Sequence, residues 1–200
     1  MKSKYLTVKN MTLIATLACL STILSILNFP LPIFPIFYEI DISDVVTLIG
    51  TFALGPIPGL FIQLIKILLN LLLNGTKTMF IGELSNLVIG SVWIYFAGII
   101  YYKDKTRRNA IKALIISSII MIIVATLINY YIILDIYSYF LNISLESLIS
   151  MGTTIIPIID SKLSFVLFAT LPFNTLKAII TSIILITIYK PISILIKKYQ

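Results

Sequence analysis

The sequence of 200 residues contains no histidine and a single cysteine, Cys19. A lone cysteine excludes an intramolecular disulfide, and without histidine the usual zinc, haem and iron–sulfur ligand sets are missing. Cys19 also has no base near it in the sequence, so a nucleophile–base pair is lacking. We therefore expect no bound metal, no cofactor and no enzymatic activity.

Charged residues are also scarce, because only 12% of the chain is Asp, Glu, Lys or Arg while 59% is hydrophobic. Soluble domains carry about 25% charged residues, so this chain has too little polar surface to cover a fold in water. An integral membrane protein is expected. At about 20 residues for each spanning helix, there is room for six or seven spans but not for a soluble ATP-hydrolysing domain. No Gly-rich phosphate-binding loop is present either.

The apolar runs predict an all-α fold, in which residues 1–200 form one membrane domain of six transmembrane helices. Pro30, Pro32 and Pro35 follow the first run and forbid a regular helix, so a structured Pro-rich loop should come after helix one. Gly55 and its neighbouring prolines divide the next long run into two shorter helices. The approximate spans are 10–28, 42–55, 57–73, 80–102, 110–133 and 171–196.

Basic residues predict the orientation in the membrane, because short cytoplasmic segments collect Lys and Arg. With six helices, the N-terminus, the connection after helix four and the C-terminus fall on one side. Both termini are therefore expected in the cytoplasm, and the Pro-rich loop outside. Because the basic residues lie at the edges of apolar segments, we expect no nucleic-acid partner. Eleven of the 15 support this assignment: Lys2, Lys4, Lys9, Lys103, Lys105, Arg107, Arg108, Lys112, Lys190, Lys197 and Lys198.

Three polar residues share one face of the predicted third helix. Gln63, Lys66 and Asn70 are three and four residues apart, so their side chains lie above one another. Polar groups are costly inside a bilayer and need a partner or a function. A hydrogen-bonded seam between helices is the simpler explanation here.

Four further polar residues are expected near helix ends on the outer side, close to the aromatic loop: Glu83, Asn129, Asn174 and Lys177. Asn174 and Lys177 are three residues apart and face the same way, just inside a last helix that Pro172 should begin. Glu83 has an alternative role as an exposed acid in a first helical turn, and Lys177 as a side chain that reaches the membrane surface. Together the four have the composition of a pocket with apolar walls and a few orienting polar groups.

The ligand class follows from these side chains. Amides, an ammonium group and aromatic faces such as Phe37 and Tyr38 suit a planar heteroaromatic molecule with carbonyl and ring-nitrogen edges. Acidic side chains near the rim suit hydroxyl groups. The residues by themselves lead no further than this class.

Five motifs occur in order along the chain: residues 29–35 (FPLPIFP), 39–44 (EIDISD), 54–59 (LGPIPG), 82–86 (GELSN) and 174–177 (NTLK). This ordered set resembles the riboflavin-specific S component of energy-coupling factor (ECF) vitamin transporters, over nearly the whole chain. The resemblance implies a substrate-binding subunit in a prokaryotic cell membrane that captures riboflavin outside. It also implies delivery inward together with a transmembrane coupling subunit and two cytoplasmic ATPases. Riboflavin would be the transported substrate and not a cofactor.

The resemblance implies roles for individual residues as well. Ring-binding roles carry over to Asn129, Asn174 and Lys177, and the loop around residues 39–44 would help to cover the ligand. We therefore name as substrate-binding candidates Asn129, Asn174, Lys177, Glu39, Asp41, Glu83, Phe37 and Tyr38. Helix one of this family packs on the coupling subunit through small residues four apart. The corresponding docking candidates are Ala15, Ala18, Cys19 and Thr22, with ordinary packing inside the chain as the alternative.

Two other functions stay open. The first is an S component for another vitamin or flavin, namely FMN, thiamine, biotin or folate. The second is a small intramembrane enzyme in which Asp41 and Asp44 hold Mg²⁺ with a phosphate substrate. Such a site usually needs more acidic residues on a second helix, which this chain lacks.

Overall fold

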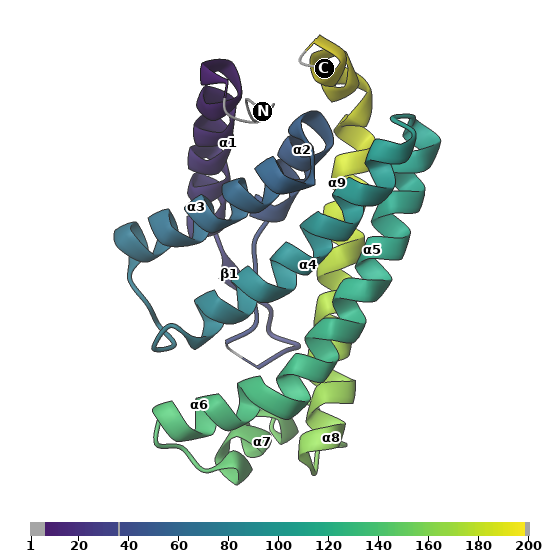
Figure 1. Cartoon of the computed structure of the whole chain (residues 1–200). Coiled ribbons are helices and arrows are strands. Elements are labelled where there is room, and N and C mark those ends of the chain that lie inside the picture. Colours follow the sequence, from purple (N-terminus) through teal and green to yellow (C-terminus); the bar gives the residue numbers. More distant parts are fainter. Residues whose placement is uncertain (1–6, 36, 199–200) are drawn as a thin grey trace.

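The computed structural model describes residues 7–35 and 37–198, which fold into a bundle of helices (Figure 1). Lys2 and Lys4 lie outside the described residues. The helices are α1 (Val8–Ile26), α2 (Ser43–Leu54), α3 (Pro56–Asn74), α4 (Ile81–Lys103), α5 (Arg107–Ile128), α6 (Leu134–Phe140), α7 (Leu145–Thr153), α8 (Lys162–Phe165) and α9 (Leu171–Lys198). One π turn, Asn129–Ile133, joins α5 to α6, and another, Val166–Thr170, joins α8 to α9.

Most of the described chain is helical, and five helical segments in it are long and apolar enough to cross a bilayer: Val8–Ile26, Pro56–Asn74, Ile81–Lys103, Arg107–Phe140 and Lys162–Lys190. The apolar helix α2 has only 12 residues, which is about 18 Å of helix and shorter than a hydrocarbon core of about 30 Å. The interruption at Gly55 is as predicted. Its φ of 117° favours glycine, and Pro56 then begins α3.

The helical segment that begins with α5 continues past the point where its apolar run weakens. The helical segment extends beyond the approximate span 110–133, because the π turn carries it on into α6 and as far as Phe140. The polar residue Asp135 is accommodated in α6 by an ion pair with Lys162, whose Nζ lies 2.6 Å from Asp135 Oδ1. Because the Asp135 side chain is 55% exposed, its charge does not require the helix to end there.

Pro172 lies in the first turn of α9, as expected, but a π turn joins α9 to an earlier short helix. The helical segment starts at Lys162, where the Ser161 side chain accepts a hydrogen bond from the Ser164 N–H. Pro172 has no N–H to donate, and it follows directly on the π turn, which closes with the Leu171 N–H bonded to the Val166 carbonyl. The wider turn changes the hydrogen-bond register where the proline enters. Lys177 therefore lies about four turns into the segment.

The Pro-rich loop, residues 27–42, folds back over the bundle. Its ends pair as two short antiparallel strands, β1 (Phe29–Pro30) and β2 (Glu39–Ile40), the only strands in the described part of the chain. Phe34 and Ile40 pack against Phe173 of α9, with the two phenyl rings 5.4 Å apart. The Tyr38 hydroxyl lies 2.6 Å from that of Thr170. The loop is thus tied to the start of α9.

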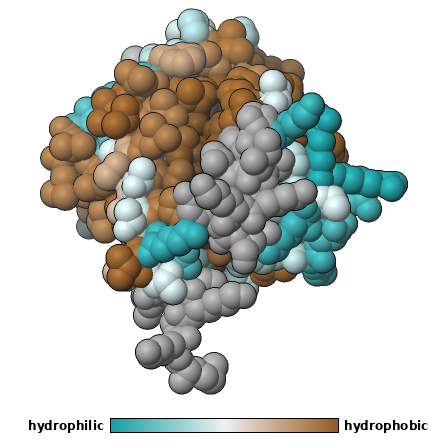
Figure 2. Space-filling view, turned by 90° about the horizontal axis from the view of Figure 1, so that it is seen from above, coloured by the Kyte–Doolittle hydropathy of each residue, from teal (hydrophilic) through white to brown (hydrophobic). Residues whose placement is uncertain are grey.

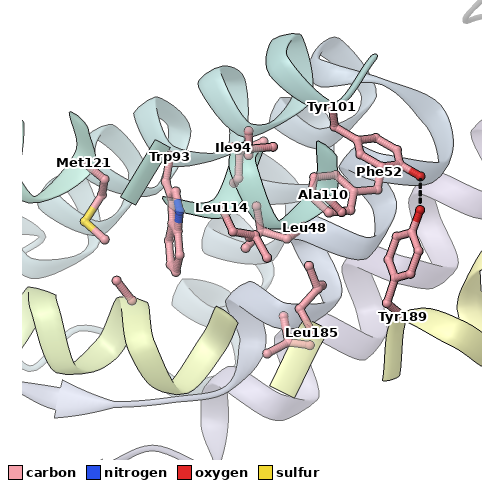
Figure 3. Packing of buried hydrophobic residues seen from close by; sticks show 14 of the residues in the cluster. Leu48, Phe52, Trp93, Ile94, Tyr101, Ala110, Leu114, Met121, Leu185 and Tyr189 are labelled. Atoms are coloured by element: carbon pink, nitrogen blue, oxygen red, sulfur yellow. Dashed lines mark hydrogen bonds between the residues drawn. The ribbon is translucent and has the colours of Figure 1, made fainter. Parts of the chain in front are cut away.

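The main core lies between α2, α4, α5 and α9 (Figure 3). Phe52 stacks on Tyr101 at 4.1 Å, and the Tyr101 hydroxyl is hydrogen bonded to that of Tyr189 at 2.9 Å. Trp93 and Met121 lie at the other side of this cluster. They also line the cavity described below, so the core forms the wall against which a ligand would rest.

The start of α1, the end of α9 and the α4–α5 connection lie at one end of the bundle, opposite α6, α7 and α8 (Figure 1). Viewed from that end, hydrophobic atoms cover one side and hydrophilic atoms gather mainly along the other (Figure 2). Large apolar side chains such as Ile23, Ile119 and Ile183 are exposed on α1, α5 and α9. An apolar surface of this extent suits contact with lipid.

Candidate functional site

A cavity of about 630 Å³ lies between the Pro-rich loop and helices α3, α4, α5 and α9. Chain segments that are far apart in the sequence meet here, and polar and aromatic side chains share its walls. All eight substrate-binding candidates line it: Phe37, Tyr38, Glu39, Asp41, Glu83, Asn129, Asn174 and Lys177. The tertiary structure therefore places the candidates around one space, and their part in binding stays a prediction.

A buried charge cluster forms one wall of this cavity. Asp44 Oδ1 lies 2.8 Å from Lys66 Nζ, and Asp44 Oδ2 lies 2.8 Å from Lys177 Nζ. Lys177 is also 3.9 Å from Asp41. Lys66 is fully buried and donates a further hydrogen bond to Ser43. Two acids and two bases cancel in formal charge, which is the condition under which ions survive burial.

Sequence reasoning missed Asp44 and Lys66 as parts of this site. The sequence predicts a hydrogen-bonded seam of Gln63, Lys66 and Asn70 on α3, and the structure confirms this seam for Gln63 and Asn70. Gln63 donates to the Asn86 carbonyl at 3.1 Å, and Asn70 donates to the Ser25 hydroxyl at 2.7 Å. A usable signal did exist, because a lysine within an apolar helix needs an acid, and the chain has only eight acids in all.

The two candidate amides have a defined orientation. Asn129 Nδ2 donates to the Ala125 carbonyl at 2.8 Å, and Asn174 Nδ2 donates to the Thr170 carbonyl at 2.9 Å. Because a carbonyl only accepts, the nitrogen must be the atom that faces it, which leaves each amide oxygen pointing elsewhere. In the part of the chain that the structure describes, neither oxygen accepts a hydrogen bond. Both are therefore available to N–H groups of a ligand.

An aromatic wall is formed by Phe37, Tyr38, Tyr137 and Phe173. Phe37 contacts Tyr38 and Tyr137, with ring centroids 4.8 and 5.6 Å apart, and Tyr38 contacts Phe173 at 4.7 Å. Burial raises the pKa of Tyr38, so its hydroxyl stays protonated at physiological pH. This wall offers flat apolar faces beside the amides and Lys177.

A polar wall is formed by Asn70, Asn74, Thr78, Glu83 and Asn86, from α3, α4 and the turn between them. At the mouth, Lys77 of this turn forms an ion pair with Glu39 of the loop at 3.0 Å. Lys77 is largely exposed, so water screens this pair. The cavity thus has two walls of different chemistry.

The alternative of a magnesium site is not supported by the arrangement of Asp41 and Asp44. Both oxygens of Asp44 are occupied by ammonium groups, and Asp41 accepts a hydrogen bond from the Ser43 N–H. Two lysines beside these acids repel a cation. No group of three metal-binding side chains occurs among the residues that the structure describes.

The docking candidates on α1 separate into two faces. Ala15 and Cys19 are exposed, whereas Ala18 and Thr22 are buried. Ala18 packs with Leu54 and Ile62 inside the chain. Ala18 and Thr22 are thus covered by the chain itself, whereas Ala15 and Cys19 lie on the open face of α1.

Comparisons with known proteins agree with this architecture. The model of the family "ECF transporter, substrate-specific component" matches residues 9–189. The riboflavin transporter RibU of Staphylococcus aureus (strain TCH60) is 28% identical over 190 residues, which cover 95% of this chain and 93% of that protein. The riboflavin transporter FmnP of Bacillus subtilis (strain 168) is 26% identical over 183 residues, covering 91% and 90%.

A solved structure with the same fold was described under the heading "Structure and mechanism of the S component of a bacterial ECF transporter". It superimposes with a TM-score of 0.73 at 29% identity, and the match covers 94% of this chain and 98% of that one.

Proposed function

This chain belongs to the family of substrate-specific components of ECF transporters, and from that premise we propose that it binds riboflavin at the outer face of the cell membrane for import. It is a multi-pass membrane protein. The observation that carries the proposal is the cavity in which Asn129, Asn174 and Lys177 lie beside an aromatic wall. Its volume lies within the range of about 300–1,000 Å³ that is usual for small-molecule sites.

The proposed contacts follow from the chemistry of the flavin ring. The ring presents an N–H group and carbonyl oxygens along one edge and apolar faces on either side. The amide oxygen of one of Asn129 and Asn174 accepts from this N–H, the second amide hydrogen of the other donates to a ring carbonyl, and Lys177 also donates to a carbonyl. Phe37 and Tyr38 cover a face, held by the bond between Tyr38 and Thr170.

We propose a topology of six spans in which α2 is the short one, with both termini in the cytoplasm. The exposed basic residues of the α4–α5 connection, Lys103, Lys105, Arg107 and Arg108, support it. That connection lies at the same end of the bundle as the start of α1 and the end of α9 (Figure 1). The Pro-rich loop then faces outward.

The experiment that tests the function is a titration of riboflavin with the purified protein in detergent, followed by the quenching of flavin fluorescence. Saturable, near-stoichiometric quenching is expected. Thiamine, biotin and folate should not displace the bound flavin. A folded sample that gives no quenching, or from which thiamine displaces the flavin, would contradict the proposal.

The amides give a first prediction at single residues. Asn129→Ala and Asn174→Ala should each weaken riboflavin binding about two- to tenfold, because loss of one hydrogen bond to a neutral group costs about 0.5–1.5 kcal/mol. The measurement is the dissociation constant from the same titration. Asn10→Ala, in the first turn of α1 and outside the cavity, is the control and should bind as the unchanged protein does. Unaltered affinity in both cavity variants would remove these residues from the site.

In this proposal, import requires energy from partner subunits, namely a transmembrane coupling subunit and two ATPases. The exposed pair Ala15 and Cys19 on α1 is proposed as the contact with the coupling subunit, since small residues four apart let helices approach closely. Riboflavin is carried unchanged, so no enzymatic step is proposed.

A bulky side chain on this face should separate binding from transport. Ala15→Trp is expected to leave riboflavin binding intact while uptake into proteoliposomes that contain the partner subunits falls about tenfold or more, because the close helix contact is lost. Ile119→Trp, at an exposed position of α5, is the matched control and should transport normally. Full uptake by Ala15→Trp would exclude this face from docking.

A further inference from the structure

Glu83 differs from the other acidic residues of the cavity wall. Glu39 is paired with Lys77, Asp41 lies within 3.9 Å of Lys177, and Asp44 is held by two lysines. Among the residues that the structure describes, Glu83 has no basic side chain within ion-pair distance. Its carboxylate is the one uncompensated negative charge that lines the described cavity.

Two hydroxyl groups fix the orientation of this carboxylate. Thr76 and Thr78 both donate to Glu83 Oε2, at 3.2 and 3.1 Å. Oε1 accepts no hydrogen bond within the described chain. The first oxygen is thus saturated by the protein, while the second keeps its full capacity to accept from a ligand.

Glu83 belongs to the polar wall, and it comes from a different helical element than Asn129, Asn174 and Lys177, the residues proposed to bind the ring. Glu83, Asn86, Gly90 and Trp93 follow one another along α4 at spacings of three and four residues, and all line the cavity. The polar wall bears amides, a hydroxyl and a carboxylate, whereas the aromatic groups come mainly from the loop, α6 and α9. A flat ring suits the aromatic wall, and a chain of hydroxyl groups suits the polar wall.

We propose that Glu83 is a specificity-determining residue: it accepts hydrogen bonds from the ribityl hydroxyls of riboflavin and disfavours flavins that end in a phosphate. This inference rests on the proposed function. A phosphate monoester carries a charge of about −1.5 to −2 near pH 7. Next to an uncompensated carboxylate in a partly desolvated cavity, that charge is repelled.

The neighbouring cations do not remove this repulsion. Lys77 is 62% exposed along its side chain and is already paired with Glu39, so it is screened by water. Lys177 is held in the charge cluster with Asp44 and Asp41. A phosphate at the polar wall therefore meets a net negative charge.

The test compares riboflavin with flavin mononucleotide on the full-length protein in detergent, by fluorescence titration of both flavins. The unchanged protein should prefer riboflavin. The quantity of interest is the dissociation constant of flavin mononucleotide divided by that of riboflavin. In Glu83→Gln, which keeps the size of the side chain, this ratio should fall about tenfold or more. Glu83→Lys should lower it further. Glu146→Gln, which removes an exposed acid of α7 outside the cavity, should leave the ratio unchanged.

The outcomes separate the two proposals. Riboflavin binding with the same ratio in both Glu83 variants would overturn the role of Glu83 and leave the function standing. Equal affinity of the unchanged protein for the two flavins would by itself overturn the role of Glu83. A folded protein that binds neither flavin would contradict the proposed function, and this inference with it.

Discussion

Replacement of Asp44 by alanine should destabilise the protein by about 3–5 kcal/mol, the usual cost of breaking a buried ion pair from one side, and should abolish most riboflavin binding. Asp44 neutralises both Lys66 and Lys177, each at 2.8 Å. Without it, two ammonium groups remain in a site that water barely reaches, and only Asp41 is left to oppose them. Lys177 also loses the carboxylate that holds it in place beside the cavity.

The midpoint of thermal unfolding in detergent measures this effect. Asp135→Ala is the matched control, because Asp135 is also paired with a lysine but has a side chain that is 55% exposed. Exposed pairs contribute only about 0–1 kcal/mol, so its midpoint should change little. Lys66→Met should cost less than Asp44→Ala, since Asp44 keeps Lys177 as a partner. Equal midpoints for Asp44→Ala and Asp135→Ala would refute the role of the charge cluster.

Exchange of Lys177 for methionine should weaken riboflavin binding by roughly tenfold to a hundredfold, because a hydrogen bond from a charged donor contributes about 1.5–3 kcal/mol. Methionine retains most of the apolar stem, so packing against the helices is kept. Asp44 remains paired with Lys66, and the protein should therefore still fold. The loss is expected in the dissociation constant, measured by flavin quenching.

Lys162→Met serves as the control for this substitution. Lys162 is also a lysine in an ion pair, with Asp135, but it lies in α8 and does not line the cavity. Its riboflavin affinity should equal that of the unchanged protein. If Lys177→Met bound riboflavin equally well, the lysine would serve the fold alone and the proposed orientation of the ring would be wrong.

Much of the site is readable from the sequence because polar residues are rare in this chain. Asn129, Asn174 and Lys177 stand out in apolar runs, so the sequence alone makes each of them a pocket candidate. Glu83 is a pocket candidate from the sequence as well, although its lack of a basic partner becomes visible only in three dimensions. The sequence indicates only a loop motif or a metal site for Asp44, since nothing local shows that Lys66 and Lys177 converge on it.

The sequence predicts some helix boundaries, but not which face of a helix turns inward. Gly55 marks a helix boundary by its own backbone preference, and it is found where the sequence predicts it. Pro172 has a comparable local preference for a first helical turn, yet it lies within a longer helical segment, because a π turn precedes it. The inward face of Ala18 and the outward face of Ala15 were likewise not distinguishable from the sequence.

The sequence by itself therefore determines the class of protein, the number of apolar runs and the positions of most breaks between them, because these depend on composition and on the backbone preferences of proline and glycine. The tertiary structure decides which lysines meet Asp44, which side of α1 faces outward and where the last helical segment begins. The physical reason is that a membrane helix is apolar on the lipid side as well as on the buried side. Apolar periodicity then cannot indicate which face turns inward, and only contacts between distant segments settle it.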